Sequence, residues 1–252
     1  MTEQDRPSPR RRLPKASDFL ASELRAQILG DGLTPGAPLS SESELIEQYG
    51  LSRGSVREAL RLLEAEGLIA IRRGPKGGIH VVHPDAGPLA RSLALLFTTQ
   101  ETTLGDFFQF RLALEPHVAA EAARSASDEE KRSMLRTARE AEADPERAAD
   151  FHAELGRCAS NSIFGFLLTA LHHVLEWHLR LETIGPGDVE ATIQAHRRIA
   201  KAIHSGDANR AEVAMRRHLQ AFADLLDQHG RLGEPIVPKS TWQRSPHDIL
   251  GR

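Results

Sequence analysis

Ionisable side chains occupy positions that the spacing of apolar residues marks for burial in the second half of the chain. After Thr103, apolar residues recur in steps of three and four, which predicts one buried helical face, and Arg111 and Glu115 lie on it. Four further segments with the same spacing place a histidine on their apolar face: His152, His178, His196 and His218. Because an unpaired buried charge costs several kcal/mol, these five segments indicate a shared polar cavity inside a helical bundle.

Three of these histidines are predicted to form a metal site. Neutral imidazole nitrogens are suitable ligands for a divalent metal such as zinc or nickel, and His152, His196 and His218 offer three of them. The alternative for each histidine alone is a core residue bonded to the backbone. The histidines that lie off these faces are expected at the surface, namely His172, His173, His204 and His229.

The same cavity is predicted to bind a small organic acid as the effector. Arg111 is placed to bind a carboxylate, and Glu115 is placed to neutralise or orient the arginine. His178 is a further candidate effector-binding residue. Cys158, the single cysteine, excludes an intramolecular disulfide and is given no role.

A second group of candidate functional residues lies at the start of a predicted helix near residue 52. Arg53, Arg57 and Arg61 lie four residues apart on one helical face, and a guanidinium group can pair bidentately with guanine or phosphate. Ser52 and Ser55, with the free amides at the helix start, suit a phosphate. These residues therefore predict a DNA-reading helix. The alternative is a solvated face whose charges are balanced by Glu58, Glu64 and Glu66.

The elements around these arginines complete a winged helix-turn-helix. Helices are predicted over residues 18–29 and from Ser41 to Tyr49, ahead of a third helix that runs from Ser52 to Glu66. Two β-like runs, 68–71 and 79–82, flank a glycine-rich turn that contains Lys76 and Gly77. This hairpin would be the wing, with Lys76 and Gly77 at the DNA.

The predicted fold class is mainly α, with this N-terminal winged helix-turn-helix (three helices plus a β-hairpin wing) and a C-terminal all-α helical bundle. The predicted boundaries run in chain order. They are a disordered basic arm (1–15), the DNA-binding domain (16–83), a linker with the first helix of the effector domain (84–100), the ligand-binding domain (101–230) and a flexible tail (231–252).

Composition excludes several classes of protein. The 252 residues are 40% hydrophobic and 27% charged, as in folded globular proteins. There is no run of 18 apolar residues to span a membrane, and the first fifteen residues lack the apolar region of a secretory signal. A cytoplasmic location is expected. The net charge of −3 gives no sign of DNA binding, so that prediction depends on the local arrangement of arginines.

Residues 33–82 resemble the DNA-binding domain of the GntR superfamily. The matching motifs are Pro35-Gly36-x-x-Leu39, Ser52-Arg53-x-x-Val56-Arg57-Glu58-Ala59-Leu60 and Leu63-Glu64-x-Glu66-Gly67-Leu68. The resemblance implies that Arg53 and Arg57 contact the operator and that the wing tip reaches the minor groove. The family usually has an arginine where this chain has Ser43, so one expected DNA contact is weakened or replaced.

Residues 101–230 resemble the all-helical effector domain of the FadR subgroup, the FCD domain. The resemblance rests on Arg111-x-x-x-Glu115, Phe151-His152 followed by Ala159-Ser160-Asn161, His196 with Arg197 and Ile199, and Gly206-Asp207 ahead of His218. It implies a metal held by three histidines and by an aspartate four residues before the first of them. Ala148 stands at that position, so the carboxylate ligand does not carry over.

Together these patterns predict a homodimeric transcription regulator, a repressor, that binds a double-stranded operator and responds to a small organic acid. It is not expected to be an enzyme. One alternative is a pure metal sensor, in which the ion itself is the signal. Another is a metal-dependent enzyme with a DNA-binding appendage, against which no motif places a general base beside the histidines.

Overall fold

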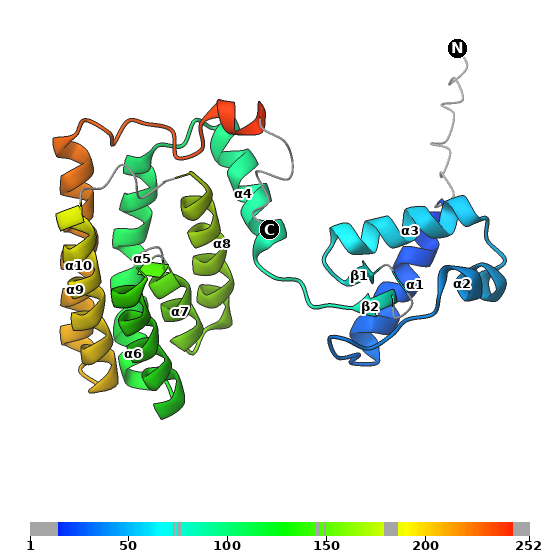
Figure 1. Cartoon of the computed structure of the whole chain (residues 1–252), viewed down its shortest axis with the longest axis horizontal. Helices are drawn as coiled ribbons and strands as arrows, with labels where there is room; N and C mark the ends of the chain where they lie inside the picture. The colour runs from blue at the N-terminus through cyan, green and yellow to red at the C-terminus, as the bar shows by residue number, and fades with distance from the viewer. Residues whose placement is uncertain are drawn as a thin grey trace, which may run out of the picture. The chain divides into compact units, whose positions relative to one another are not determined.

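The computed structural model describes residues 15–72, 74, 77–144, 147–148, 150–178 and 186–243 (Figure 1). Within them the chain has ten α-helices and one two-stranded sheet, which confirms the mainly helical fold class. The chain divides into two compact units between Pro88 and Leu89, a few residues after the predicted boundary. The predicted basic arm, apart from Lys15, and the wing residue Lys76 lie outside the described residues.

The N-terminal unit is a winged helix-turn-helix. Its elements are α1 (Ala16–Gly30), α2 (Glu42–Tyr49), α3 (Arg53–Ala65), β1 (Ile69–Arg72) and β2 (Gly78–Val81). Ser41 starts α2 with a capping box, because its hydroxyl accepts from the Glu44 amide and its own amide donates to the Glu44 carboxylate. Gly50 adopts a φ of 63° in the turn that leads toward α3.

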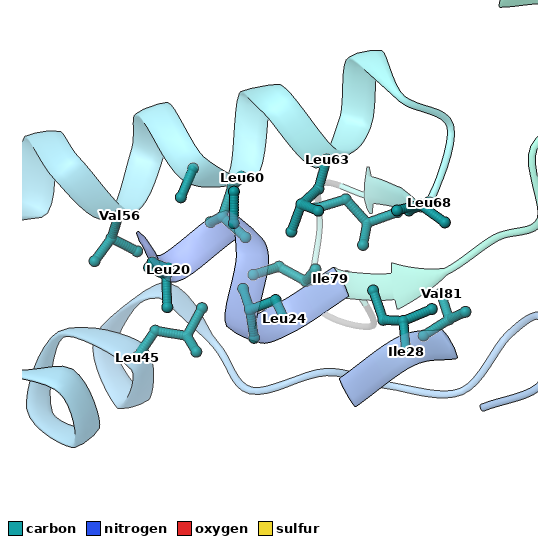
Figure 2. Packing of buried hydrophobic residues seen from close by; sticks show 13 residues of the cluster. Leu20, Leu24, Ile28, Leu45, Val56, Leu60, Leu63, Leu68, Ile79 and Val81 are labelled. Carbon is teal, nitrogen blue, oxygen red and sulfur yellow. The ribbon is translucent and has the colours of Figure 1, made fainter. Parts of the chain in front are cut away.

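The core of this unit fixes which face of α3 is exposed. Val56, Leu60 and Leu63 on α3 pack against α1, α2 and the hairpin in a cluster of thirteen buried residues (Figure 2). The antiparallel hairpin pairs Ile69 with Val81, and the Leu39 amide donates to the Ile79 carbonyl, so the chain ahead of α2 also pairs with β2. The arginine face of α3 is therefore left in solvent.

The C-terminal unit consists of helices. They are α4 (Gly87–Thr99), α5 (Leu104–Ser125), α6 (Asp128–Ala143), α7 (Asp150–Cys158), α8 (Ser162–His178), α9 (Pro186–His204) and α10 (Ala208–Gln228). Figure 1 shows α5 inside the bundle, where it contacts α10, α9 and α7. The α7 helix also packs on α8, and α6 packs on α9. The predicted apolar face of α5 is buried along its length, including Arg111 and Glu115.

Residues 231–243 differ from the flexible tail that was predicted. The Leu104 amide donates to the Glu234 carbonyl, and the Ile236 amide donates to the Thr102 carbonyl. Ile236 and Val237 are buried, and the indole of Trp242 donates to the hydroxyl of Thr98 at 2.8 Å. Pro235 and Pro238 are typical of a loose segment, but here they flank two apolar residues that pack. This segment therefore holds the end of α4 and the start of α5.

Among the described residues, no helix combines the length and the apolar character that crossing a membrane requires.

Candidate functional site

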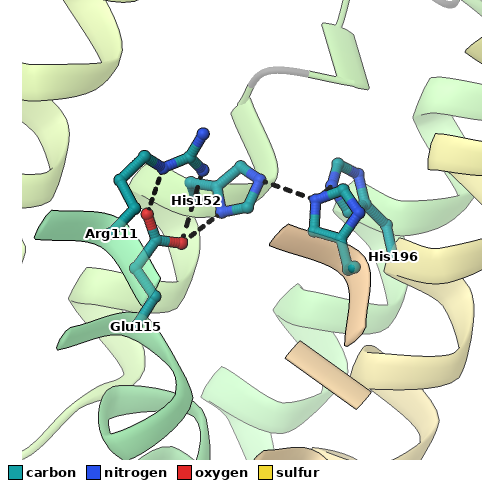
Figure 3. A network of polar contacts seen from close by, with 5 residues as sticks. Arg111, Glu115, His152 and His196 are labelled. Carbon is teal, nitrogen blue, oxygen red and sulfur yellow. Dashed lines mark hydrogen bonds and ion pairs between the residues drawn. The ribbon is translucent and has the colours of Figure 1, made fainter. Parts of the chain in front are cut away.

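Three histidines from three helices meet in the interior of the C-terminal unit. His152 on α7, His196 on α9 and His218 on α10 each direct Nε2 toward the others, as Figure 3 shows for the labelled His152 and His196. The His196 and His218 Nε2 atoms are 3.1 Å apart, and those of His218 and His152 are 3.4 Å apart. We call these three residues the histidine triad. The predicted convergence is present in the structure.

A buried ion pair supports the triad from α5. Glu115 accepts a hydrogen bond from Arg111 Nε, and its Oε2 lies 2.6 Å from His152 Nδ1 (Figure 3). A carboxylate at this position favours the proton on Nδ1, which leaves the Nε2 lone pair of His152 free to bind a metal. The Arg111 guanidinium carbon lies 5.7 Å from the ring centroid of Phe107 and 5.2 Å from that of Phe108, within reach of cation–π contact.

The electrostatics of the site favour an ionised glutamate beside neutral imidazoles. Burial alone would raise the pKa of the Glu115 carboxyl, but Arg111 and His152 lower it, and the net direction is downward. Burial lowers the pKa of His152, and Arg111 lowers it further, against the opposing effect of Glu115. Burial also lowers the pKa of His196 and His218, and the neighbouring histidines add to this. Neutral imidazoles are the form that binds metal.

The spacing of the triad fits a tetrahedral ion. Two nitrogen ligands about 2.1 Å from zinc, at the tetrahedral angle, lie about 3.4 Å apart. The His196–His218 and His218–His152 Nε2 separations, 3.1 and 3.4 Å, are close to this value. His196 Nδ1 is buried without a hydrogen-bond partner within the described structure, while its ring stacks on Phe151 at 4.2 Å. The donor set and its spacing therefore suit a zinc or nickel ion.

No carboxylate joins the triad. Asp150, at the start of α7, lies 3.4 Å from Arg147 and 3.6 Å from His172. Ala148 stands four residues before His152, where the resemblance implies an aspartate ligand. The α7 helix begins only at Asp150, and Ala148 instead packs with Ala141 and Ile193 in an apolar cluster. The described groups that can hold a metal here are the three imidazoles alone.

His172 is a site residue that the sequence did not predict. It was expected at the surface, but it is 8% exposed and lines a cavity of about 30 Å³ with Arg111, Glu115 and His152. Burial, followed by the charges of His173 and His152, lowers the pKa of His172 to about 3, so it is neutral near pH 7. The ring faces the cavity because α7 packs over this part of α8, a contact that no periodicity within α8 reveals.

The predictions for the remaining histidines have different outcomes. His204 and His229 are exposed, as predicted, and His173 is half-buried. His178 is the last residue of α8, and its side chain lies outside the described part of the chain, so its predicted effector contact stays a prediction.

The start of α3 presents the residues predicted to contact DNA. Ser52 caps the helix, because its hydroxyl accepts from the Ser55 amide at 3.2 Å, and the two hydroxyl oxygens are 3.0 Å apart. Arg53, Arg57 and Arg61 are exposed on one side of α3, opposite the core. Their placement as DNA contacts remains a prediction.

A glutamate on α2 holds two of these arginines, and the sequence did not identify it. The Arg57 Nε lies 3.0 Å from the Glu42 carboxylate, and the Arg53 Nε lies 3.6 Å from it. The glutamates expected to balance the arginines bond elsewhere. Glu58 lies near Lys15, Glu64 accepts from the Ile71 amide, and Glu66 pairs with Arg25.

Replacing Glu42 with glutamine is expected to tighten DNA binding by about two- to fivefold. The Glu42 carboxylate competes with DNA phosphates for Arg53 and Arg57, and an exposed ion pair of this kind is worth under about 1 kcal/mol. Fluorescence anisotropy with operator and with unrelated DNA measures the change. Glu47→Gln is the matched control, because Glu47 is exposed on the same helix. Weaker operator binding by Glu42→Gln would instead mean that Glu42 holds the arginines in the bound geometry.

Gly77, a predicted DNA contact, lies in the turn between the two strands. The amide of Gly77 donates to the Gly74 carbonyl at 2.8 Å, which closes the turn between the strands. Lys76 lies outside the described residues. Ser43, where the resemblance leads one to expect arginine, is exposed on α2 beside Glu42.

Comparison with known proteins gives two family matches. Residues 16–81 match the model of the bacterial regulatory proteins of the gntR family, and residues 106–221 match the FCD domain. The chain is 30% identical over 234 residues to the HTH-type transcriptional repressor NanR of Enterobacter sp. (strain 638), covering 86% of this chain and 87% of that protein.

Two other relatives agree with this match. A proposed regulator of the L-lactate dehydrogenase operon in Escherichia coli (strain K12) is 31% identical over 218 residues, which cover 81% of this chain and 84% of that protein. The solved structure of a GntR protein from Streptococcus agalactiae superposes with a TM-score of 0.62 at 25% identity, covering 82% of this chain and 99% of that one.

Proposed function

Because the chain belongs to the gntR family of bacterial regulatory proteins and carries an FCD domain, we propose that this DNA-binding transcription regulator responds to a small organic acid bound at a metal ion on the histidine triad. The observation that carries the proposal is the convergence of three imidazole Nε2 atoms beside a buried Arg111–Glu115 pair. A divalent ion supplies a Lewis acid for a carboxylate oxygen. The protein's own side chains would orient the ligands of the ion and bind the remaining oxygens of the acid.

Each supporting residue has a distinct part in this proposal. Glu115 keeps the proton of His152 on Nδ1 and fixes the orientation of the ring. Arg111 keeps Glu115 ionised and offers its remaining N–H groups to a bound carboxylate. The cavity beside them, about 30 Å³, has the volume of about one water molecule, so an organic acid that binds there must displace the surrounding side chains. Such a displacement is how effector binding would reach the rest of the domain.

The size of an operator bears on the oligomeric state that we propose. One small domain reads few base pairs, so we propose a homodimer whose two winged domains read two half-sites. The effector would favour one arrangement of these two domains over the other. Relatives named as repressors support repression as the sign of control, and we propose the cytoplasm as the location, because that is where a bacterial operator lies.

Two alternatives are less well supported. The relatives are transcription regulators, so we propose no enzymatic activity. A pure metal sensor would leave the cavity beside Arg111, and the N–H groups of Arg111 that Glu115 does not bind, without a role. Adding zinc alone to the protein–operator complex discriminates, since release by the ion alone would favour the sensor.

Replacing Arg111 with alanine is expected to abolish the response to an organic acid while operator binding without effector stays intact. The effector is first found by a thermal-shift screen of organic acids on the zinc-loaded protein, because a ligand that binds only the native state raises the Tm. Isothermal titration then compares parent and variant, and undiminished affinity would contradict the assignment.

A parallel zinc titration of the Arg111→Ala protein shows how Arg111 acts. If zinc affinity is retained while effector affinity falls, Arg111 contacts the effector directly. If both fall together, Arg111 acts by holding Glu115 against His152.

A further inference from the structure

A groove of about 540 Å³ lies between α9 and α10 and is separate from the small cavity beside Arg111. Its volume is in the range of small-molecule sites. Small side chains line both helices in the groove, including Ala191 and Ala195 on α9 and Ala214 and Ala221 on α10, and this leaves the space open. The groove also reaches His218, so it borders the triad at a different histidine from the small cavity, which His152 lines.

Three arginines line this groove, namely Arg198 on α9 with Arg210 and Arg217 on α10. Within the described residues, none of their guanidinium groups forms an ion pair. Their immediate neighbours are paired, since Arg197 lies 2.8 Å from Glu142 and Arg216 lies 3.2 Å from Glu212. Among the described arginines of α9 and α10, those without a carboxylate partner are therefore the ones that line the groove.

The charge of the lining favours an anion. With the triad neutral, the lining holds three arginines and one carboxylate, that of Asp188, which leaves a formal charge of +2. Guanidinium groups bind phosphate and carboxylate oxygens through paired N–H donors, and this geometry discriminates planar or tetrahedral anions from neutral molecules. Apolar Phe222 and Val213 in the same lining can cover the carbon skeleton of an organic ligand.

We propose that this groove binds the doubly charged end of a small organic anion, a phosphate monoester or a dicarboxylate, beside His218. Only the regulatory consequence rests on the proposed function, because binding itself requires no metal and no operator. If the proposed effector site is correct, the groove restricts the chemical class of the effector. The effector would then carry a dianionic group in addition to any metal-bound carboxylate.

Isothermal titration of the full-length protein tests the proposal with three probes: glucose 6-phosphate, succinate and, as the neutral control, glucose. We expect one of the two dianions to bind and glucose not to bind. Arg217→Gln should weaken binding about tenfold, and adding Arg198→Gln should weaken it about tenfold again, since each removes a charged hydrogen-bond donor.

Arg216→Gln is the matched control, because Arg216 is the adjacent exposed arginine on the same helix but pairs with Glu212 outside the groove. It should leave the affinity unchanged. The proposal is overturned if neither dianion binds, or if Arg216→Gln weakens binding as much as Arg217→Gln does, which would indicate a general effect of net charge.

Zinc affinity, measured by chelator competition on the same proteins, separates this proposal from the proposed function. Zinc binding without dianion binding overturns the groove and leaves the metal-dependent effector site standing. Dianion binding that Arg217→Gln weakens, in a protein that holds no zinc, supports the groove and contradicts the metal site.

Discussion

Replacing His196 with alanine is expected to abolish zinc and nickel binding at the triad, lowering the affinity by more than about 100-fold. The variant loses one of three nitrogen ligands, and no described carboxylate is close enough to replace it. With zinc at about 100 times its Kd, the parent should gain about 2.7 kcal/mol of stability from the ion, and His196→Ala should gain almost none. Differential scanning calorimetry with and without zinc measures the difference.

His204→Ala is the matched control, because His204 is an exposed histidine in the last turn of the same helix. It should keep the full zinc response. Because His196 is buried, its replacement also changes the stability of the metal-free protein, so the comparison is of the zinc-dependent increment in each protein. Equal increments in His196→Ala and the parent would mean that the three histidines are core residues and share no metal.

The second large effect concerns the operator. Arg57→Ala is expected to weaken operator binding by about 1–3 kcal/mol if the guanidinium pairs with a base edge. Gel-shift titration at several salt concentrations measures both the affinity and its salt dependence. A contact to phosphate alone would weaken operator and unrelated DNA about equally and would flatten the salt dependence.

Arg91→Ala provides the control, because Arg91 is an exposed arginine on α4, outside the winged domain. It removes the same charge and should leave operator affinity within about twofold of the parent. Unchanged operator affinity in Arg57→Ala would contradict the placement of α3 in the major groove.

The triad could be predicted from the sequence because helical periodicity reports which face of a helix is buried. His152, His196 and His218 each lie on such a face, and a buried polar residue must find a partner. Arg111 and Glu115 were recognised in the same way, and all five are buried as the spacing indicates. The helix start predicted at Ser41 was a local signal of the same kind, and its capping box is present.

Contacts between distant segments could not be predicted in this way. His172 lies off the apolar face of its own segment and is buried beside residues of α5 and α7, and Glu42 reaches Arg57 from another helix. Ala148 lies ahead of Asp150, where α7 begins, so the four-residue step from Ala148 to His152 does not run along one α-helix. The packing of residues 231–243 likewise depends on a partner more than a hundred residues away.

The contact of Trp242 with α4 gives the molecule a built-in optical probe. Only two tryptophans occur in the sequence, Trp177 and Trp242, and the indole of Trp242 is bonded to Thr98 on the helix that leads from the DNA-binding unit. In a Trp177→Phe background, all tryptophan emission would come from Trp242, whose indole contacts the end of α4. The wavelength and intensity of this emission would report, in real time and without a label, whether the contact between Trp242 and Thr98 persists when a ligand or an operator binds.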